Sequence, residues 1–191
     1  MPSNQDNVVL GFDPGLTRCG FGIVQKASSR QVKFLEVGVF QSDKDLDQSH
    51  RIAIIGDQIA GLLDRIKPEQ IAIERLFAQQ NLQSVMGVAQ ISGVIVYLAH
   101  QRNIPVTFFT PTEVKAAVTG SGRANKAQVM NMVMQILKLK ELPKPADAAD
   151  ALAIAVTLAW RGGKSLIGPS STETKAQEKW RNAIASSKKS R

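Results

Sequence analysis

Val8-Val9-Leu10-Gly11-Phe12-Asp13-Pro14-Gly15 is the segment from which the architecture of this 191-residue chain can be argued. Its first five residues are apolar, and a short apolar run before a turn predicts a buried β-strand. The Pro-Gly pair predicts the turn, so Asp13 stands where the strand ends.

The rest of the chain alternates between strand and helix patterns. Further strands are expected at residues 20–25, 32–40, 71–73 and 105–109. Helices are expected at residues 52–66, 82–100, 111–120, 125–137 and 147–160. Thr110 with Glu113, and Asn125, have the positions of helix N-caps. Three strands able to form a meander, followed by alternating helices and strands, predict an α/β fold in which helices cover both faces of a mixed sheet.

The helix expected at residues 82–100 is apolar around nearly its whole circumference. Such a helix needs cover on two sides. One side can pack on the sheet, and the other side could contact a partner subunit. The pattern is therefore a first indication of a homodimer.

Composition limits the class of protein. A single cysteine excludes a disulfide framework and a cysteine-based zinc cluster, and it fits a reducing cytoplasm. The N-terminus has no basic start followed by an apolar run, so no secretory signal is expected. The longest charge-free stretch, residues 76–101, contains Gln, Ser and Asn and makes a poor membrane span. We expect a cytoplasmic protein without a membrane segment.

Positive charge is concentrated in two regions. The chain has 24 Lys and Arg against 16 Asp and Glu, a net charge of +8. Residues 164–191 hold seven basic and two acidic side chains, and residues 113–144 hold six basic and two acidic ones. Two basic regions suggest a polyanion partner, most simply nucleic acid. The polar composition predicts a single domain at 1–163 and a flexible basic tail at 164–191, which could serve only solubility.

Four carboxylates stand in apolar surroundings. Asp13 and Glu74 each end a strand, whereas Asp147 and Asp150 lie three residues apart at the start of an alanine-rich helix and share one face. Carboxylates that gather near a core repel one another, and a divalent cation between them relieves the repulsion. Oxygen ligands select Mg²⁺ or Mn²⁺ over zinc.

Each acid also has an ordinary structural explanation. Asp13 could serve its turn, because Asp-Pro-Gly is a common turn sequence. Asp147 could cap its helix with Asp150 supporting the first turn, and Glu74 could form a surface ion pair. The acids indicate a metal site only if the strand order brings all four together.

Four blocks follow one another in a distinctive order. They are Gly-Phe-Asp-Pro-Gly at 11–15, Ile-Glu-Arg-Leu-Phe at 73–77, a basic segment at 114–129, and Pro-Ala-Asp-Ala-Ala-Asp-Ala-Leu-Ala at 145–153. Together they resemble the RuvC family of Holliday-junction resolvases over residues 8–160. One departure is Ile91-Ser92-Gly93, where related sequences often carry Ala-Arg-Gly, which puts any function of that arginine in doubt here.

The resemblance implies an RNase H-like fold, with a five-stranded mixed sheet between helices, and a homodimer. It implies that Asp13, Glu74, Asp147 and Asp150 hold two Mg²⁺ ions, for which Mn²⁺ can substitute, and hydrolyse phosphodiesters to 5′-phosphate and 3′-hydroxyl ends. The implied substrate is a four-way DNA junction, nicked symmetrically by two sites of a two-fold dimer during recombination and repair. The implied partners are the branch-migration proteins RuvA and RuvB.

Four further residues are candidates for DNA contact. Lys115, Arg123 and Lys126 flank a Gly-rich loop that leads into a helix start, where cations and backbone N–H groups meet phosphate, although they could form an ordinary solvated surface. Phe77 could stack on an opened base or fold back into the core, and the resemblance favours DNA.

Three smaller features are weighed beside these. Gly20 and Gly22, inside a strand, could permit close approach of the DNA backbone or mark a bulge. Cys19, His50 and His100 are assigned no chemistry, and Cys19 has no His nearby in the sequence that would activate its thiol.

Two other functions compete with the junction nuclease. A YqgF-type RNase H-like nuclease lacks the Ala-Asp-Ala-Ala-Asp-Ala block, so Asp147 and Asp150 discriminate against it. An actin-like ATPase also begins with a strand and an Asp-Gly turn. It needs a second lobe and a second Gly-rich phosphate loop, and neither is recognisable in these 191 residues.

Overall fold

The apolar segment near the start of the chain forms β1 (Val8–Asp13), the central strand of a five-stranded sheet. The structure is a computed structural model that describes residues 7–28, 30–75 and 82–162. The strand order is β3-β2-β1-β4-β5, in which the other strands are β2 (Arg18–Lys26), β3 (Val32–Gln41), β4 (Gln70–Glu74) and β5 (Val106–Phe109). The pairs β1–β2 and β2–β3 are antiparallel, whereas β1–β4 and β4–β5 are parallel. The predicted mixed sheet with an antiparallel meander is confirmed.

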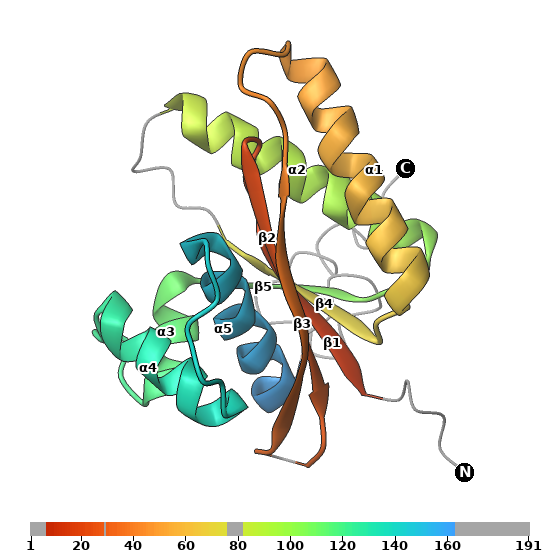
Figure 1. Cartoon of the computed structure of the whole chain (residues 1–191). Coiled ribbons are helices and arrows are strands. Elements are labelled where there is room, and N and C mark those ends of the chain that lie inside the picture. Colours follow the sequence, from red (N-terminus) through yellow and green to blue (C-terminus); the bar gives the residue numbers. More distant parts are fainter. Residues whose placement is uncertain (1–6, 29, 76–81, 163–191) are drawn as a thin grey trace, which may run out of the picture.

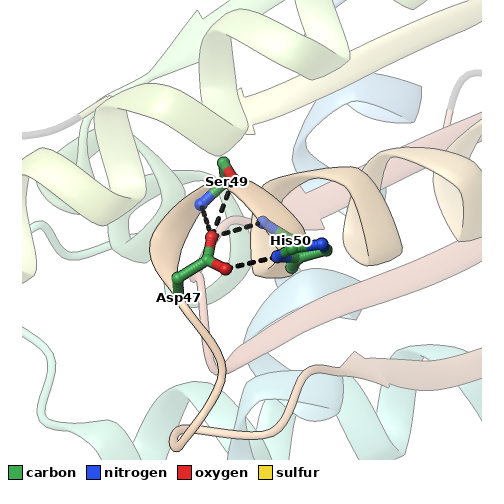
Figure 2. A network of polar contacts seen from close by, with 3 residues as sticks. All are labelled: Asp47, Ser49 and His50. Carbon is green, nitrogen blue, oxygen red and sulfur yellow. Dashed lines mark hydrogen bonds and ion pairs between the residues drawn. The ribbon is translucent and has the colours of Figure 1, made fainter.

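Two helices, α1 (Gln48–Ile66) and α2 (Leu82–Gln101), cover one face of the sheet (Figure 1). α1 begins four residues before its first predicted apolar residue because Asp47 caps it. The Oδ1 atom of Asp47 accepts hydrogen bonds from the N–H groups of Ser49 and His50 at 3.0 and 3.1 Å, and His50 Nδ1 contacts Oδ2 (Figure 2). The hydrogen bonds from Ser49 and His50 hold the pKa of Asp47 below its ordinary value. His50 therefore belongs to a helix cap, as a structural residue.

α2 has one covered side and one open side. Ile91, Ile95 and Ala99 are fully buried in the core beneath the helix. On the other side, the relative exposure of Met86 is 55% and that of Tyr97 is 61%. Among the described residues, the apolar pattern of this helix is thus covered on one side only.

Three helices, α3 (Pro111–Thr119), α4 (Lys126–Leu137) and α5 (Ala146–Arg161), lie on the opposite face (Figure 1). Both predicted caps are present: Thr110 forms a capping box with Glu113, and Asn125 forms one with Gln128. α5 is buried along almost its whole length, because the sheet lies beneath it and α3 and α4 pack beside it. Helices on both faces of the sheet confirm the predicted layering.

Gly20 and Gly22 of β2 allow α5 to lie unusually close to the sheet. A Cβ atom at Gly22 would come within 2.7 and 2.8 Å of the backbone N and Cα of Leu152. A Cβ atom at Gly20 would collide with the carbonyl oxygen of Asp147. The interpretation of these glycines as an approach for DNA is therefore corrected, since a helix of the same chain occupies that space. The irregularity of β2 lies at Ile23 and Val24, beyond both glycines.

Three further predictions concern a membrane segment, Phe77 and the C-terminal tail. No helix in the described part of the chain is long and apolar enough to cross a membrane. Phe77 and the expected tail at 164–191 lie outside the described residues.

The close packing at Gly22 predicts a loss of stability in Gly22→Ala. The added methyl group would press on the backbone of α5, and overpacking of this kind costs about 1–3 kcal/mol. The matched control is Gly61→Ala in α1, where a Cβ atom meets nothing within 4 Å. The control should gain up to about 1 kcal/mol from higher helix propensity.

Urea denaturation of both variants measures the difference. If Gly22→Ala were as stable as Gly61→Ala, the close contact between α5 and the sheet would be contradicted.

Candidate active site

Asp13 and Glu74 end two neighbouring parallel strands. In the register of β1 and β4, Phe12 pairs with Ile73, so the next residue of each strand is one of the two acids. Because the carboxyl ends of parallel strands meet at one edge of a sheet, the two acids lie side by side at that edge.

The first turns of α5 bring Asp147 and Asp150 to the same edge. Gly20 pairs with Asp13 across β1 and β2, and the backbone of Asp147 packs directly on Gly20. Asp150, three residues further along α5, shares its face. Pro145 occupies the N-cap position without a side-chain cap hydrogen bond, so Asp147 does not cap its helix.

The acids are close enough for their charges to raise the pKa of Asp13 and of Glu74. Burial, followed by the negative charges of Glu74, Asp150 and Asp147, raises the pKa of Asp13 to about 7. Burial and the charge of Asp150 raise the pKa of Glu74, and Lys126 opposes that shift. The sequence indicated a metal site only if the strand order brought all four acids together. The structure does bring them together in one cluster.

Two lysines lie beside the acids on the side of α3 and α4. Lys126 Nζ donates a hydrogen bond of 2.7 Å to Asp150 Oδ2, and this bond raises the pKa of Lys126. Lys115 and Lys126 line a cavity of about 230 Å³ together with Glu74 and Asp150, and its remaining walls are apolar. A phosphate that approached the acids from this side would meet both ammonium groups.

Arg18, which was not predicted as a site residue, contacts Asp147 away from the cavity that Lys115 and Lys126 line. Its Nε lies 2.7 Å from Asp147 Oδ2. Arg18 also lines an open hollow of about 850 Å³ with Asp13, Asp147 and Arg51. The available signal was its place at the start of β2, directly after the turn that follows Asp13.

Three other residues considered in the sequence, Arg123, Cys19 and Ser92, differ in their burial. Arg123 is exposed in the loop before α4 and is not among the residues that line the cavity beside Lys126. Cys19 is buried, and burial raises the pKa of its thiol to about 12, which makes it a poor nucleophile. Ser92 is buried within α2.

The donor set of the cluster fits a hard divalent cation. All four acids offer carboxylate oxygens, the ligand type that Mg²⁺ and Mn²⁺ prefer. The Oδ2 atom of Asp147 is buried and accepts no hydrogen bond, but it forms an ion pair with Arg18, so a metal cation would have to replace the guanidinium there. Within the described residues, no three acidic, His or Cys side chains stand ready as a ligand set, and two of the acids are instead paired with Lys126 and Arg18. These two carboxylates must therefore turn from their ion pairs to share a cation.

Comparison with known proteins places this arrangement in a family. The family model described as crossover junction endodeoxyribonuclease RuvC matches residues 9–158. The crossover junction endodeoxyribonuclease RuvC of Leifsonia xyli subsp. xyli is 50% identical over 188 residues, which cover 92% of this chain and 90% of the relative. The protein of that name from Rhodococcus opacus is 54% identical over 153 residues, 80% of this chain and 81% of the relative.

Solved structures give the same result for the fold. T. thermophilus RuvC in complex with a Holliday junction substrate aligns with a TM-score of 0.76 and 35% identity, covering 80% of this chain and 93% of that one. The yeast mitochondrial Holliday junction resolvase Ydc2 aligns with a TM-score of 0.59 at 16% identity, covering 93% and 83%, and shares the fold alone. The architecture is RNase H-like, and by the match to its model and to these relatives the chain belongs to the RuvC family of crossover junction endodeoxyribonucleases.

Proposed function

We propose that this chain is a divalent-metal-dependent endonuclease that resolves four-way DNA junctions by paired symmetric nicks in recombination and repair. The observation that carries the proposal is the convergence of Asp13, Glu74, Asp147 and Asp150 at one edge of the sheet, with Lys115 and Lys126 beside them. The site of activity is the cytoplasm, where it would meet chromosomal DNA.

The four carboxylates would hold two Mg²⁺ ions, and Mn²⁺ would substitute for them. Such ions lower the pKa of the attacking water and stabilise charge on the attacking and leaving oxygens of an in-line displacement, which leaves 5′-phosphate and 3′-hydroxyl ends. The chain itself fixes the backbone positions of the four ligands, because two come from paired strands and two from a helix packed tightly on those strands.

The basic residues would bind and orient the DNA. Lys115 and Lys126 stand beside the acids and would contact phosphates next to the cleaved bond. Arg123, exposed in the adjoining loop, would contact the backbone further away. Phe77, which follows Glu74 by three residues, is proposed to stack on an opened base at the crossover.

A homodimer would present two such sites to the two symmetric strands of a junction. The exposed apolar side of α2, with Met86 and Tyr97, is the surface we propose for the dimer contact. RuvA and RuvB are proposed as partners from the family resemblance. The match to the RuvC model across residues 9–158 includes the Asp147–Asp150 block and so favours this function over a YqgF-type nuclease or an ATPase.

Synthetic four-way junctions and matched linear duplexes test the function directly. With Mg²⁺, we expect paired symmetric nicks on the junction, and with EDTA none. Asp13→Asn should reduce nicking by at least about 10²-fold, since it removes a metal ligand. It should leave junction affinity nearly unchanged, because the lost carboxylate is proposed to act on the metal and not on the phosphates. Normal cleavage by Asp13→Asn would contradict the assignment.

Thermal unfolding of the metal-free protein would test whether the Asp13→Asn variant is still folded. The pKa of Asp13 is raised to about 7, so the folded chain holds a proton that the unfolded chain releases. Stability from this group is therefore lost as pH rises from about 4 to about 7. Asp13→Asn should be more stable than the wild type at pH 8, and the difference should shrink at pH 5.

Lys115→Ala combined with Lys126→Ala should weaken junction binding for all sequences. Loss of two phosphate contacts should reduce the slope of log K against log salt by about 2. The matched control is Lys138→Ala with Lys140→Ala, which removes the same charge beyond the far end of α4. An equal salt slope in both double variants, measured by fluorescence anisotropy, would count against this surface.

Gly93→Glu tests the dimer. Gly93 is exposed on α2 and a Cβ atom there meets nothing within 4 Å, so the variant should fold normally. A glutamate on the proposed contact surface would be buried without a partner, and light scattering should show monomers. Gly61→Glu on α1 should remain dimeric. A wild-type monomer, or a dimeric Gly93→Glu, would contradict the proposed contact.

A further inference from the structure

Arg18 forms an ion pair with Asp147 that lacks an aligned hydrogen bond. Its Nε lies 2.7 Å from Asp147 Oδ2, yet that buried oxygen accepts no hydrogen bond, so the contact is electrostatic and lacks a directed N–H bond. The side chain of Arg18 is 56% exposed, and that of Asp147 is 26% exposed. Because the guanidinium is exposed to water, which screens its charge, this contact can be exchanged for another at small cost.

The turn before Arg18 is held by Ser42, which follows β3, and by Arg51 in the first turn of α1. Arg51 Nη2 donates to Thr17 Oγ1 at 2.6 Å, and Arg51 Nε donates to Ser42 Oγ at 3.1 Å. The hydroxyl of Ser42 donates in turn to the carbonyl oxygen of Leu16 at 2.6 Å. These bonds fix the backbone just before Arg18, so only its side chain has to move between partners.

An open hollow gives the side chain of Arg18 somewhere to turn. The hollow of about 850 Å³ is lined by Asp13, Asp147, Arg18 and Arg51, and it shares no lining residue with the cavity that holds Lys115. The acids therefore lie between two basic surfaces. An arginine is suited to this position, because its planar guanidinium matches both a carboxylate and a phosphate.

We propose that Arg18 is a positioning residue that couples metal binding to DNA binding. In the metal-free protein it neutralises Asp147. When a divalent cation engages Asp147, the guanidinium is released into the hollow and contacts a phosphate of the DNA backbone, on the side of the acids away from Lys126. This inference rests on the proposed function of the site.

Arg18→Gln tests the coupling with two measurements that do not depend on cleavage. The first is Mn²⁺ affinity of the EDTA-stripped full chain, followed by electron paramagnetic resonance. Without a competing cation, the variant should bind Mn²⁺ about two- to fivefold more tightly, the range that an exposed ion pair contributes. The second is the ratio of junction dissociation constants without and with Ca²⁺. This ratio should fall by a similar factor, because the variant releases no guanidinium.

Two control variants separate this role from general charge. Arg30→Gln removes the same charge in the turn between β2 and β3, at the opposite end of β2, and should change neither measurement. Arg18→Lys keeps a cation beside Asp147 and should retain the wild-type Mn²⁺ affinity.

The outcomes distinguish the inference from the proposed function. If the wild type binds Mn²⁺ and the junction but Arg18→Gln matches it in either measurement, the coupling role of Arg18 is overturned and the nuclease assignment stands. If the wild type binds neither Mn²⁺ nor the junction, the proposed function fails and this inference fails with it.

Discussion

The close contact between α5 and the paired strands β1 and β2 is the constraint on which the site depends. Two acids come from the sheet and two from α5, so the distance between helix and sheet sets the distance between the pairs. Glycines in β2 remove the side chains that would hold the helix away, and alanines make up much of the buried helix. This packing places the backbone of Asp147 against Gly20, which pairs with Asp13 at the end of β1. Larger side chains between the helix and the sheet would separate the carboxylates and weaken their joint binding of a cation.

The same packing brings negative charges together, and the side chains of Lys126 and Arg18 partly neutralise them. Burial and mutual repulsion disfavour the charged forms of Asp13 and Glu74. Lys126 and Arg18 each pair with one of the acids on α5, from opposite sides of the cluster. Both cations belong to side chains that can also contact phosphate. In the proposed function, these two cations would leave the carboxylates and contact DNA phosphates when metal ions bind.

The sequence was most informative where chemistry is local. The strand endings at Asp13 and Glu74, the capping boxes at Thr110 and Asn125, and the spacing of Asp147 and Asp150 are all legible in short segments. Contacts between segments far apart in the sequence could not be predicted. The prediction that Gly20 and Gly22 make room for DNA was wrong because α5, the helix that packs on them, lies about 130 residues later in the sequence. Arg18 was missed because an ion pair across helix and sheet leaves no periodic pattern, and Asp47 because a polar cap precedes the apolar pattern of its helix.

Anomalous diffraction from crystals of the full chain soaked in Mn²⁺ would show how the metal centre is assembled, because it locates the ion without reference to catalysis. We expect Mn²⁺ at coordination distance from Asp13 and from at least one of the two acids on α5, with Arg18 or Lys126 turned away from its carboxylate. Mn²⁺ bound only elsewhere, or a site that used none of the α5 acids, would contradict the claim that helix packing assembles the metal centre.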